Sequence, residues 1–226
     1  MVPWGWRRSI DGGTAWSMMG LEDTRTIHRI RIHPTDPKTV YVAAMGSAWG
    51  TNPERGVFRT QDGGETWDHV LSIDDTTGCA EMIMDPSNPD KLFAAMWSFH
   101  REPWRFTSGG EGSGLYVTHN AGDDWTRLAE DEWLPKGTLG RMGFTMSPAD
   151  PDVVYALSES KKTGLYKSTD GGANWDLVST ENIGNRPFYY AEIHADPSAP
   201  DRLFNLYSMV SESTDGGRTF EVILPY

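Results

Sequence analysis

An eight-residue motif occurs five times along the chain, and this repetition constrains the fold more than any other feature of the sequence. Each copy has the form Ser/Thr-x-Asp/Asn-x-Gly-x-x-Trp/Phe, and the copies begin at Ser9, Thr60, Thr118, Ser168 and Ser213. Their Asp or Asn residues are 45–58 residues apart. A repeat of this period predicts a row of similar structural units rather than one irregular domain.

A Pro-x-x-Pro motif alternates with the first motif and occurs four times. Its proline pairs are Pro34 and Pro37, Pro86 and Pro89, Pro148 and Pro151, and Pro197 and Pro200. An aromatic residue follows four positions after each second proline: Tyr41, Phe93, Tyr155 and Phe204. Because proline fixes φ and cannot donate to a strand ladder, these motifs predict turns between strands.

Between the two motifs the sequence alternates with a period of two residues, which is typical of strands. Ile30 and Ile32 alternate with arginines, and Phe144 and Met146 alternate with Gly143 and Thr145. Each unit has room for four strands: one before the prolines, one with the aromatic residue, a third such as 56–59, 114–117 or 164–167, and a fourth that begins at the motif Trp. Four short antiparallel strands per repeat form the blade of a β-propeller.

The sequence therefore predicts an all-β fold, a β-propeller of four-stranded antiparallel blades. Full blades are expected at 27–71, 79–129, 139–180 and 189–224, and a half blade at 1–20, giving about four and a half blades in one domain or fragment, 1–226. The chain is expected to be a slice of a larger propeller, or else a five-blade ring. Uncovered flanks of the terminal blades predict self-association or contact with further blades.

The eight-residue motif resembles the Asp box, also called the bacterial neuraminidase (BNR) repeat. The chain as a whole resembles sortilin-like and "glycosyl hydrolase BNR repeat" bacterial proteins, and segments 26–31, 54–67 and 186–197 carry this similarity. Other families with the box are sialidases, xyloglucan-degrading glycosidases, the sortilin luminal domain and photosystem II assembly propellers. The resemblance implies a propeller fold and a secreted or periplasmic location, although the first residues lack the apolar segment of a signal peptide.

The boxes are expected to be structural. The Asp accepts hydrogen bonds from its own turn, the glycines supply positive φ, and the aromatic ring packs between sheets. Five equivalent copies on one rim cannot all form one active site. The residues assigned to this structural role are Asp11, Trp16, Asp62, Trp67, Asn120, Trp125, Asp170, Trp175, Asp215 and Phe220.

Function is expected on the face opposite the boxes, where the loops are long and irregular. Aromatic faces and Arg side chains there suit sugar rings, carboxylates or peptide chains. Alternatively, these aromatics fill gaps between loops or pack against further blades. The candidate ligand-binding residues are Trp49, Trp97, His100, Arg101, Trp104, Arg105, Trp133, Arg141, Arg186, Tyr189 and Tyr190.

Two classes of function stay open. The first is a non-catalytic propeller that binds a protein, peptide or glycan; the alternative is a glycoside hydrolase of sialidase or xyloglucanase type. Sialidase resemblance implies an arginine cluster, for which Arg25, Arg141 and Arg186 are candidates, but the Arg-Ile-Pro signature is absent. A two-carboxylate mechanism needs acidic residues on both sides of the scissile bond. No pair stands out among Asp74, Asp75, Glu102, Asp131, Glu132 and Glu192.

The amino-acid composition excludes several classes of binding partner. The 226 residues include 20 basic and 32 acidic side chains, and the net charge of −12 argues against nucleic acid and anionic membranes as partners. The single cysteine, Cys79, excludes an intrachain disulfide and a Cys-rich zinc site. No metal or cofactor motif is present, so neither is expected. The apolar runs are too short to span a bilayer, and no membrane insertion is expected.

Overall fold

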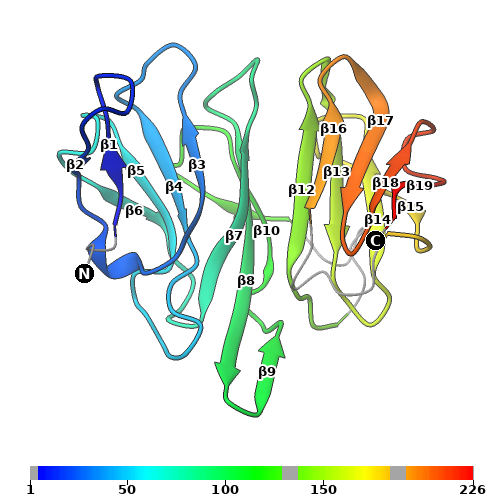
Figure 1. Ribbon diagram of the computed structural model, residues 1–226, viewed down its shortest axis with the longest axis horizontal. Helices are drawn as coiled ribbons and strands as arrows, with labels where there is room; N and C mark the ends of the chain where they lie inside the picture. Colours follow the sequence, from blue (N-terminus) through cyan, green and yellow to red (C-terminus); the bar gives the residue numbers. More distant parts are fainter. Residues whose placement is uncertain (1–4, 129–136, 184–191, 226) are drawn as a thin grey trace.

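The computed structural model describes residues 5–128, 137–183 and 192–225, and within them it is all-β except for one turn of 3-10 helix, Glu22–Thr24 (η1). The strands form one two-stranded hairpin and four antiparallel sheets that stand side by side (Figure 1). The predicted fold class, a propeller of four-stranded antiparallel blades, is confirmed. No helix in these residues is long and apolar enough to cross a membrane.

The sheets follow the chain in order, and we number them as blades. The half blade contains β1 (Arg7–Arg8) and β2 (Ser17–Met18). Blade 1 contains β3 (Ile27–Ile32), β4 (Val40–Ala44), β5 (Gly56–Thr60) and β6 (Asp68–Leu71). Blade 2 contains β7 (Thr77–Met84), β8 (Leu92–Glu102), β10 (Gly114–Thr118) and β11 (Thr126–Arg127), and β9 (Arg105–Ser108) pairs with the distal part of β8.

Blades 3 and 4 repeat this meander. Blade 3 contains β12 (Met142–Ser147), β13 (Asp150–Ser158), β14 (Gly164–Ser168) and β15 (Asp176–Ser179). Blade 4 contains β16 (Glu192–Asp196), β17 (Ala199–Leu206), β18 (Val210–Ser213) and β19 (Glu221–Leu224). The first strands of the four blades, β3, β7, β12 and β16, contact one another in sequence and form the inner layer.

The hydrophobic core lies between the blades. In blades 1 to 3 the aromatic residue that follows the Pro-x-x-Pro turn points into such an interface: Tyr41 packs with Met82 of blade 2, and the ring centroid of Phe93 lies 5.2 Å from that of Phe144 of blade 3. Tyr41, Phe93 and Tyr155 are at most 1% exposed, whereas Phe204 of blade 4 is only partly buried. Burial of a large apolar side chain contributes about 1.5–3 kcal/mol, so each blade depends on its neighbour for stability.

The Asp boxes form a repeated hydrogen-bonded turn. In blade 1, Asp62 Oδ1 accepts the backbone N–H groups of Glu65 and Thr66 at 2.9 and 3.0 Å, and Thr60 Oγ1 accepts that of Gly64 at 2.9 Å. Asn120 accepts the Asp124 N–H at 3.0 Å in the same way. An amide oxygen therefore substitutes for a carboxylate oxygen in this turn, because the turn uses the side chain only as an acceptor.

The box turns and the Pro-x-x-Pro turns lie at the same end of each blade. The N–H of the residue after the box Asp donates to the proline turn of its own blade, as in Gly63 to Lys38 O and Gly171 to Asp152 O, both at 2.9 Å. We call this end the turn face. The opposite end is the long-loop face, which carries the β4–β5 and β13–β14 connections and the β8–β9 hairpin (Figure 1, lower edge).

The box aromatics differ in burial, which departs in part from the expectation that Trp67, Trp125 and Trp175 are largely buried. Trp175 and Phe220 are 8% and 9% exposed, but Trp67 and Trp125 are only half-buried, and Trp16 is 58% exposed. The difference follows from what each ring meets. Trp67, for example, packs edge-on against Trp6 of the half blade at 5.4 Å, whereas no blade in the described residues covers Trp16.

Candidate functional site

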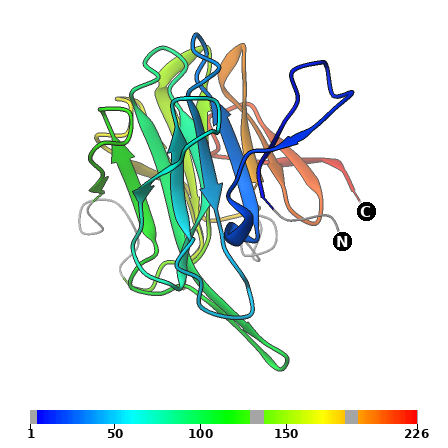
Figure 2. The ribbon, with the colours of Figure 1, turned by 90° about the vertical axis from the view of Figure 1, so that its left-hand side faces the viewer.

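The β8–β9 hairpin extends blade 2 beyond its neighbours on the long-loop face (Figures 1 and 2). The sequence predicts an irregular loop in this segment, but β8 continues to Glu102 and pairs in register with β9. Trp104, in the connecting turn, is 82% exposed. The neighbouring Arg105 forms an ion pair with Glu102 across the turn at 3.1 Å. The hairpin therefore presents an indole on a hydrogen-bonded support.

The β4–β5 connection places a second tryptophan beside this hairpin. The backbone N–H of Arg101 donates to the carbonyl of Ala48 at 2.8 Å. The Arg101 guanidinium lies 5.9 Å from the ring centroid of Trp49, which is 63% exposed. We call Trp49, Arg101, Trp104 and Arg105 the Trp–Arg patch.

A buried arginine holds the β4–β5 connection in place. Arg55, 1% exposed, donates to the carbonyl oxygens of Ser47 and Gly50 at 2.5 and 3.1 Å, and to that of Thr76 at 2.8 Å. Its guanidinium lies 4.5 Å from the Phe99 ring centroid. The loop that carries Trp49 is thus ordered without a ligand, which reduces the entropy lost on binding.

The remaining candidate ligand-binding residues are not part of the Trp–Arg patch. Trp97 is 3% exposed, stacks on Phe99 at 4.5 Å and donates to Ser108 Oγ at 3.0 Å, so it forms the base of the hairpin rather than a ligand surface. Arg141 is 7% exposed and lies 5.8 Å from the Trp97 ring centroid. His100 is partly buried within β8. Four candidates lie outside the described residues: Trp133, Arg186, Tyr189 and Tyr190.

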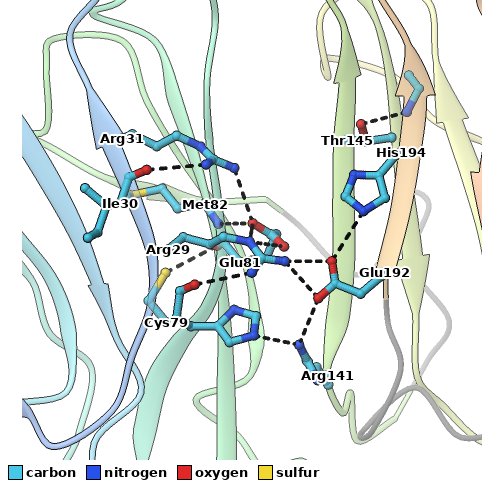
Figure 3. Close-up of polar contacts among 12 residues, drawn as sticks. Arg29, Ile30, Arg31, Cys79, Glu81, Met82, Arg141, Thr145, Glu192 and His194 are labelled. Atoms are coloured by element: carbon cyan, nitrogen blue, oxygen red, sulfur yellow. Dashed lines mark hydrogen bonds and ion pairs between the residues drawn. The ribbon is translucent and has the colours of Figure 1, made fainter. Parts of the chain in front are cut away.

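A second polar group, the charge cluster, lies on the inner strands of the blades (Figure 3). Its centre is Arg29 on β3. Arg29 Nε donates to both carboxylate oxygens of Glu81 on β7 at 2.8 and 2.9 Å. Arg29 Nη2 donates to both oxygens of Glu192 on β16 at 2.8 and 2.7 Å. One side chain therefore links blades 1, 2 and 4.

Further arginine and histidine side chains surround the two carboxylates. Arg141 Nη2 donates to His28 Nε2 at 3.0 Å and lies 3.8 Å from Glu192. Arg31 Nη2 lies 3.6 Å from Glu81, and His194 Nε2 lies 3.5 Å from Glu192. The sequence suggests Arg141 for an arginine cluster and Glu192 as a candidate carboxylate, two separate roles, and it does not single out Arg29 or Glu81. In the structure these four residues, with His28, Arg31 and His194, make up the charge cluster.

Glu192 does not suit the role of the acid in a glycosidase. The His194 side chain, followed by Arg29 and Arg141, lowers the pKa of Glu192 to about 2. A glycosidase acid needs a raised pKa so that it carries a proton near neutral pH. A pocket of about 450 Å³ adjoins the cluster, and among the described residues that line it Glu81 is the only carboxylate. No group of three His, Cys, Asp or Glu in the described part of the chain could hold a metal ion.

We expect His28 to make the stability of the fold depend on pH. Burial, with Arg141 and Arg29, lowers its pKa from 6.5 to about 4. Between these values the unfolded chain binds more protons than the folded chain, so the free energy of unfolding falls as the pH is lowered from 6.5 to about 4. Glu192 extends the fall, because its stabilisation is present above 4.5 and is lost as the pH drops toward about 2.

Urea unfolding at a series of pH values measures this dependence. Glutamine at position 28 does not titrate. The free energy of unfolding of His28→Gln is therefore expected to change less than that of the wild type between pH 6.5 and about 4, and equally below that range. A slope unchanged by His28→Gln would contradict the role of His28.

One known protein family matches more than half of the chain. Residues 6–132 match the family model described as Sortilin-Vps10 (sortilin, neurotensin receptor 3), and this segment is more than half of the chain. The chain belongs to the Sortilin-Vps10 family. Its five boxes and its propeller agree with this family and with BNR-type propellers in general.

Individual proteins match most of the length of this Sortilin-Vps10 chain, but the matched region is only part of each of those proteins. A Paenibacillus xyloglucanase is 22% identical over 204 residues, 83% of this chain and 19% of that protein. An ancestral GH74 enzyme has a TM-score of 0.68 at 17% identity, covering 97% of this chain and 28% of its own. The GH74 enzyme of Niastella koreensis has a TM-score of 0.69 at 16% identity, and the match covers 94% of this chain and 33% of that enzyme.

A third similar structure is YCF48 bound to D1 peptide, with a TM-score of 0.54 and 17% identity, covering 94% of this chain and 59% of that one. At such identities the structural likeness shows the fold alone. The chain spans about a fifth of the length of the xyloglucanase that it matches.

Proposed function

We propose that this chain is a non-catalytic, ligand-binding part of an Asp-box propeller, and that it binds a glycan or peptide chain through the Trp–Arg patch. The observation that carries the proposal is the exposure of two indoles, Trp49 at 63% and Trp104 at 82%, on supports that are already ordered. An exposed aromatic surface on a rigid scaffold is a common feature of binding sites.

The chemistry of the patch fits an extended polar chain with apolar faces. An indole offers a flat apolar surface to a sugar ring or a peptide side chain. Arg101 and Arg105 offer guanidinium groups that donate hydrogen bonds to hydroxyl, carbonyl or carboxylate oxygens. We favour a glycan over a peptide, because the relative that matches 83% of the chain is a xyloglucanase. A secreted or periplasmic location is part of the same proposal.

Trp49→Ala and Trp104→Ala are each expected to weaken glycan binding by about tenfold or more, because removing an aromatic anchor leaves no surface for the sugar ring. Calorimetry with xyloglucan oligosaccharides and with a peptide library measures the effect. Trp16→Ala is the matched control, since Trp16 is also exposed but belongs to the turn face. Unchanged affinity in both patch variants, or an equal loss in the control, would refute the proposed site.

A xyloglucanase-type hydrolase is the second candidate, and the xyloglucanase relative favours it. Three of the candidate carboxylates within the described residues argue against a hydrolase, because their side chains are already engaged in ion pairs or hydrogen bonds. Glu102 pairs with Arg105, Glu192 pairs with Arg29, and Asp74 accepts hydrogen bonds from Thr76 and Thr77. Asp131 and Glu132 lie outside the described residues.

Release of reducing sugar from xyloglucan, or of aglycone from an aryl-sialoside, tests the hydrolase. Release by the wild type that disappears in Glu192→Gln would replace the binding proposal with the hydrolase. Binding without release would support the binding proposal.

A further inference from the structure

The pocket of about 450 Å³ beside the charge cluster has no part in the function proposed above. The inner strands of all four blades line it, with Arg31 of β3, Ile83 of β7, Phe144 of β12 and His194 of β16. Pro86 and Pro148, which belong to two of the Pro-x-x-Pro turns, also line it, so the pocket lies toward the turn face. It is therefore separate from the Trp–Arg patch on the long-loop face.

Arg31 carries a positive charge that its neighbours compensate only in part. Within the described residues its polar contacts are long: Nη2 lies 3.6 Å from Glu81, and Nη1 donates to Ile30 O at 3.4 Å. The bonds of Arg29 to its two carboxylates are 2.7–2.9 Å. Burial lowers the pKa of Arg31, which means that the site disfavours its charge. A partly buried cation without a close counter-ion attracts an anion.

The charge cluster as a whole has the same sign. It contains three arginines and two carboxylates, so it has one excess positive charge before either histidine is counted. The whole chain has a net charge of −12, which makes this excess a local exception. The cluster would therefore hold an anion in the pocket although most of the surface repels one.

Two further donors line the pocket from strands that lie across from Arg31. Figure 3 shows Thr145 and His194 on this other side. Thr145 Oγ1 accepts the backbone N–H of Ala195 at 3.1 Å, so its own O–H is left to donate. The half-exposed ring of His194 donates from both nitrogens when it is protonated, and a nearby anion favours that form. A tetrahedral oxyanion can accept from donors on three strands at once, whereas a carboxylate has only two oxygens in one plane.

The rest of the pocket wall is apolar. Ile83, Met84, Phe144 and Met146 line it together with the two prolines. The volume, about 450 Å³, is within the range of small-molecule sites, roughly 300–1,000 Å³. An inorganic ion would leave this apolar surface in contact with water. The pocket therefore suits a ligand with an apolar or aromatic part next to its anionic group.

We propose that this pocket binds a sulfate or phosphate monoester, with its oxyanion between Arg31 and His194 and its organic part on Phe144 and Met146. The chemistry shared by the two esters is a tetrahedral oxyanion attached to an apolar group. Because the pocket and the Trp–Arg patch share no residue, either site can be occupied without the other.

NMR of the chain labelled at its methionine methyl groups tests the site directly, because Met84 and Met146 line the pocket. Phenyl sulfate and phenyl phosphate are each titrated to about 10 mM, beyond the roughly millimolar dissociation constants of weak ligands of this size. Both methyl signals are expected to shift, and the ester that binds more tightly identifies the oxyanion. Benzoate, which lacks a third oxygen, and inorganic sulfate, which lacks an apolar part, are each expected to bind at least about fivefold more weakly.

Arg31→Met is expected to weaken ester binding about tenfold or more, because it removes the cation that pairs with the oxyanion. Arg202→Met is the matched control, since Arg202 is 45% exposed against 34% for Arg31 and lies on β17, outside the inner layer. Circular dichroism establishes that both variants are folded. The proposal is overturned if neither ester shifts the Met84 and Met146 signals, if benzoate binds as tightly as the esters, or if both variants lose affinity equally.

Discussion

Replacing Arg29 with methionine is expected to lower the free energy of unfolding by about 3–5 kcal/mol, the usual cost of removing one partner from a buried ion pair. Glu81, whose side chain is 7% exposed, and Glu192, at 28%, would lose the cation that neutralises both of them. The hydrophobic side chain of methionine supplies no hydrogen bond to either carboxylate. Urea unfolding at neutral pH measures the loss.

Arg31→Met is the matched control for Arg29→Met. Arg31 lies on the same strand, but its Nη2 is 3.6 Å from Glu81 and makes no close bidentate pair, so the expected cost is below about 1 kcal/mol. Adding Glu81→Gln and Glu192→Gln to Arg29→Met removes the unpaired charges and should recover part of the stability. Equal losses in Arg29→Met and Arg31→Met would contradict a linking role for Arg29.

Trp175→Ala is expected to cost about 3–5 kcal/mol, because it leaves a cavity between blades 2 and 3. The ring is 8% exposed, lies 5.8 Å from Phe144 and shares a cluster with Phe93. Trp16→Ala changes the same motif position where the ring is 58% exposed, and should cost less than about 0.5 kcal/mol. Thermal and urea unfolding of dilute samples gives both values. Similar costs would mean that the box aromatics act within their own turns and not between blades.

Much of the fold could be predicted from the sequence because its signals are local. Asp62 forms its turn with residues no more than four positions away, and each Pro-x-x-Pro motif interrupts a strand ladder by its own chemistry. The third strands expected at 56–59 and 164–167 are found as β5 and β14, each one residue longer. Repetition of these short-range signals identified the blade.

The charge cluster could not be predicted in the same way. Alternation on β3 separates Ile30 and Ile32 from Arg29 and Arg31 without showing which set faces the neighbouring blades. In the structure Ile30 and Ile32 are 42% and 58% exposed, while Arg29 reaches Glu192 across 163 residues of sequence. Such a pairing depends on how whole blades are arranged in space, and a short stretch of sequence does not reveal that arrangement.

The hairpin of blade 2 was missed for a different reason. The sequence predicts a long, irregular connection from Trp97 onward, whereas β8 continues through Trp97 and Phe99 to Glu102. Both are buried, at 3% and 5%, in a strand that is buried without interruption from Leu92 to Phe99. Burial in the structure therefore separates Trp97 from the exposed Trp49 and Trp104, which the sequence alone does not do.

The contacts between the blades on the turn face have consequences for how a protein of this kind changes size during evolution. At three joints on the turn face a basic side chain donates to a backbone carbonyl of the next blade, whereas at the joint of blades 3 and 4 Lys167 donates to the Asp201 carboxylate. A gene duplication that adds one blade of 45–58 residues would create two joints of a chemistry already present. The number of blades can thus change without a new interface having to arise, whereas the link that Arg29 makes between blades 1, 2 and 4 fixes the order of those particular blades.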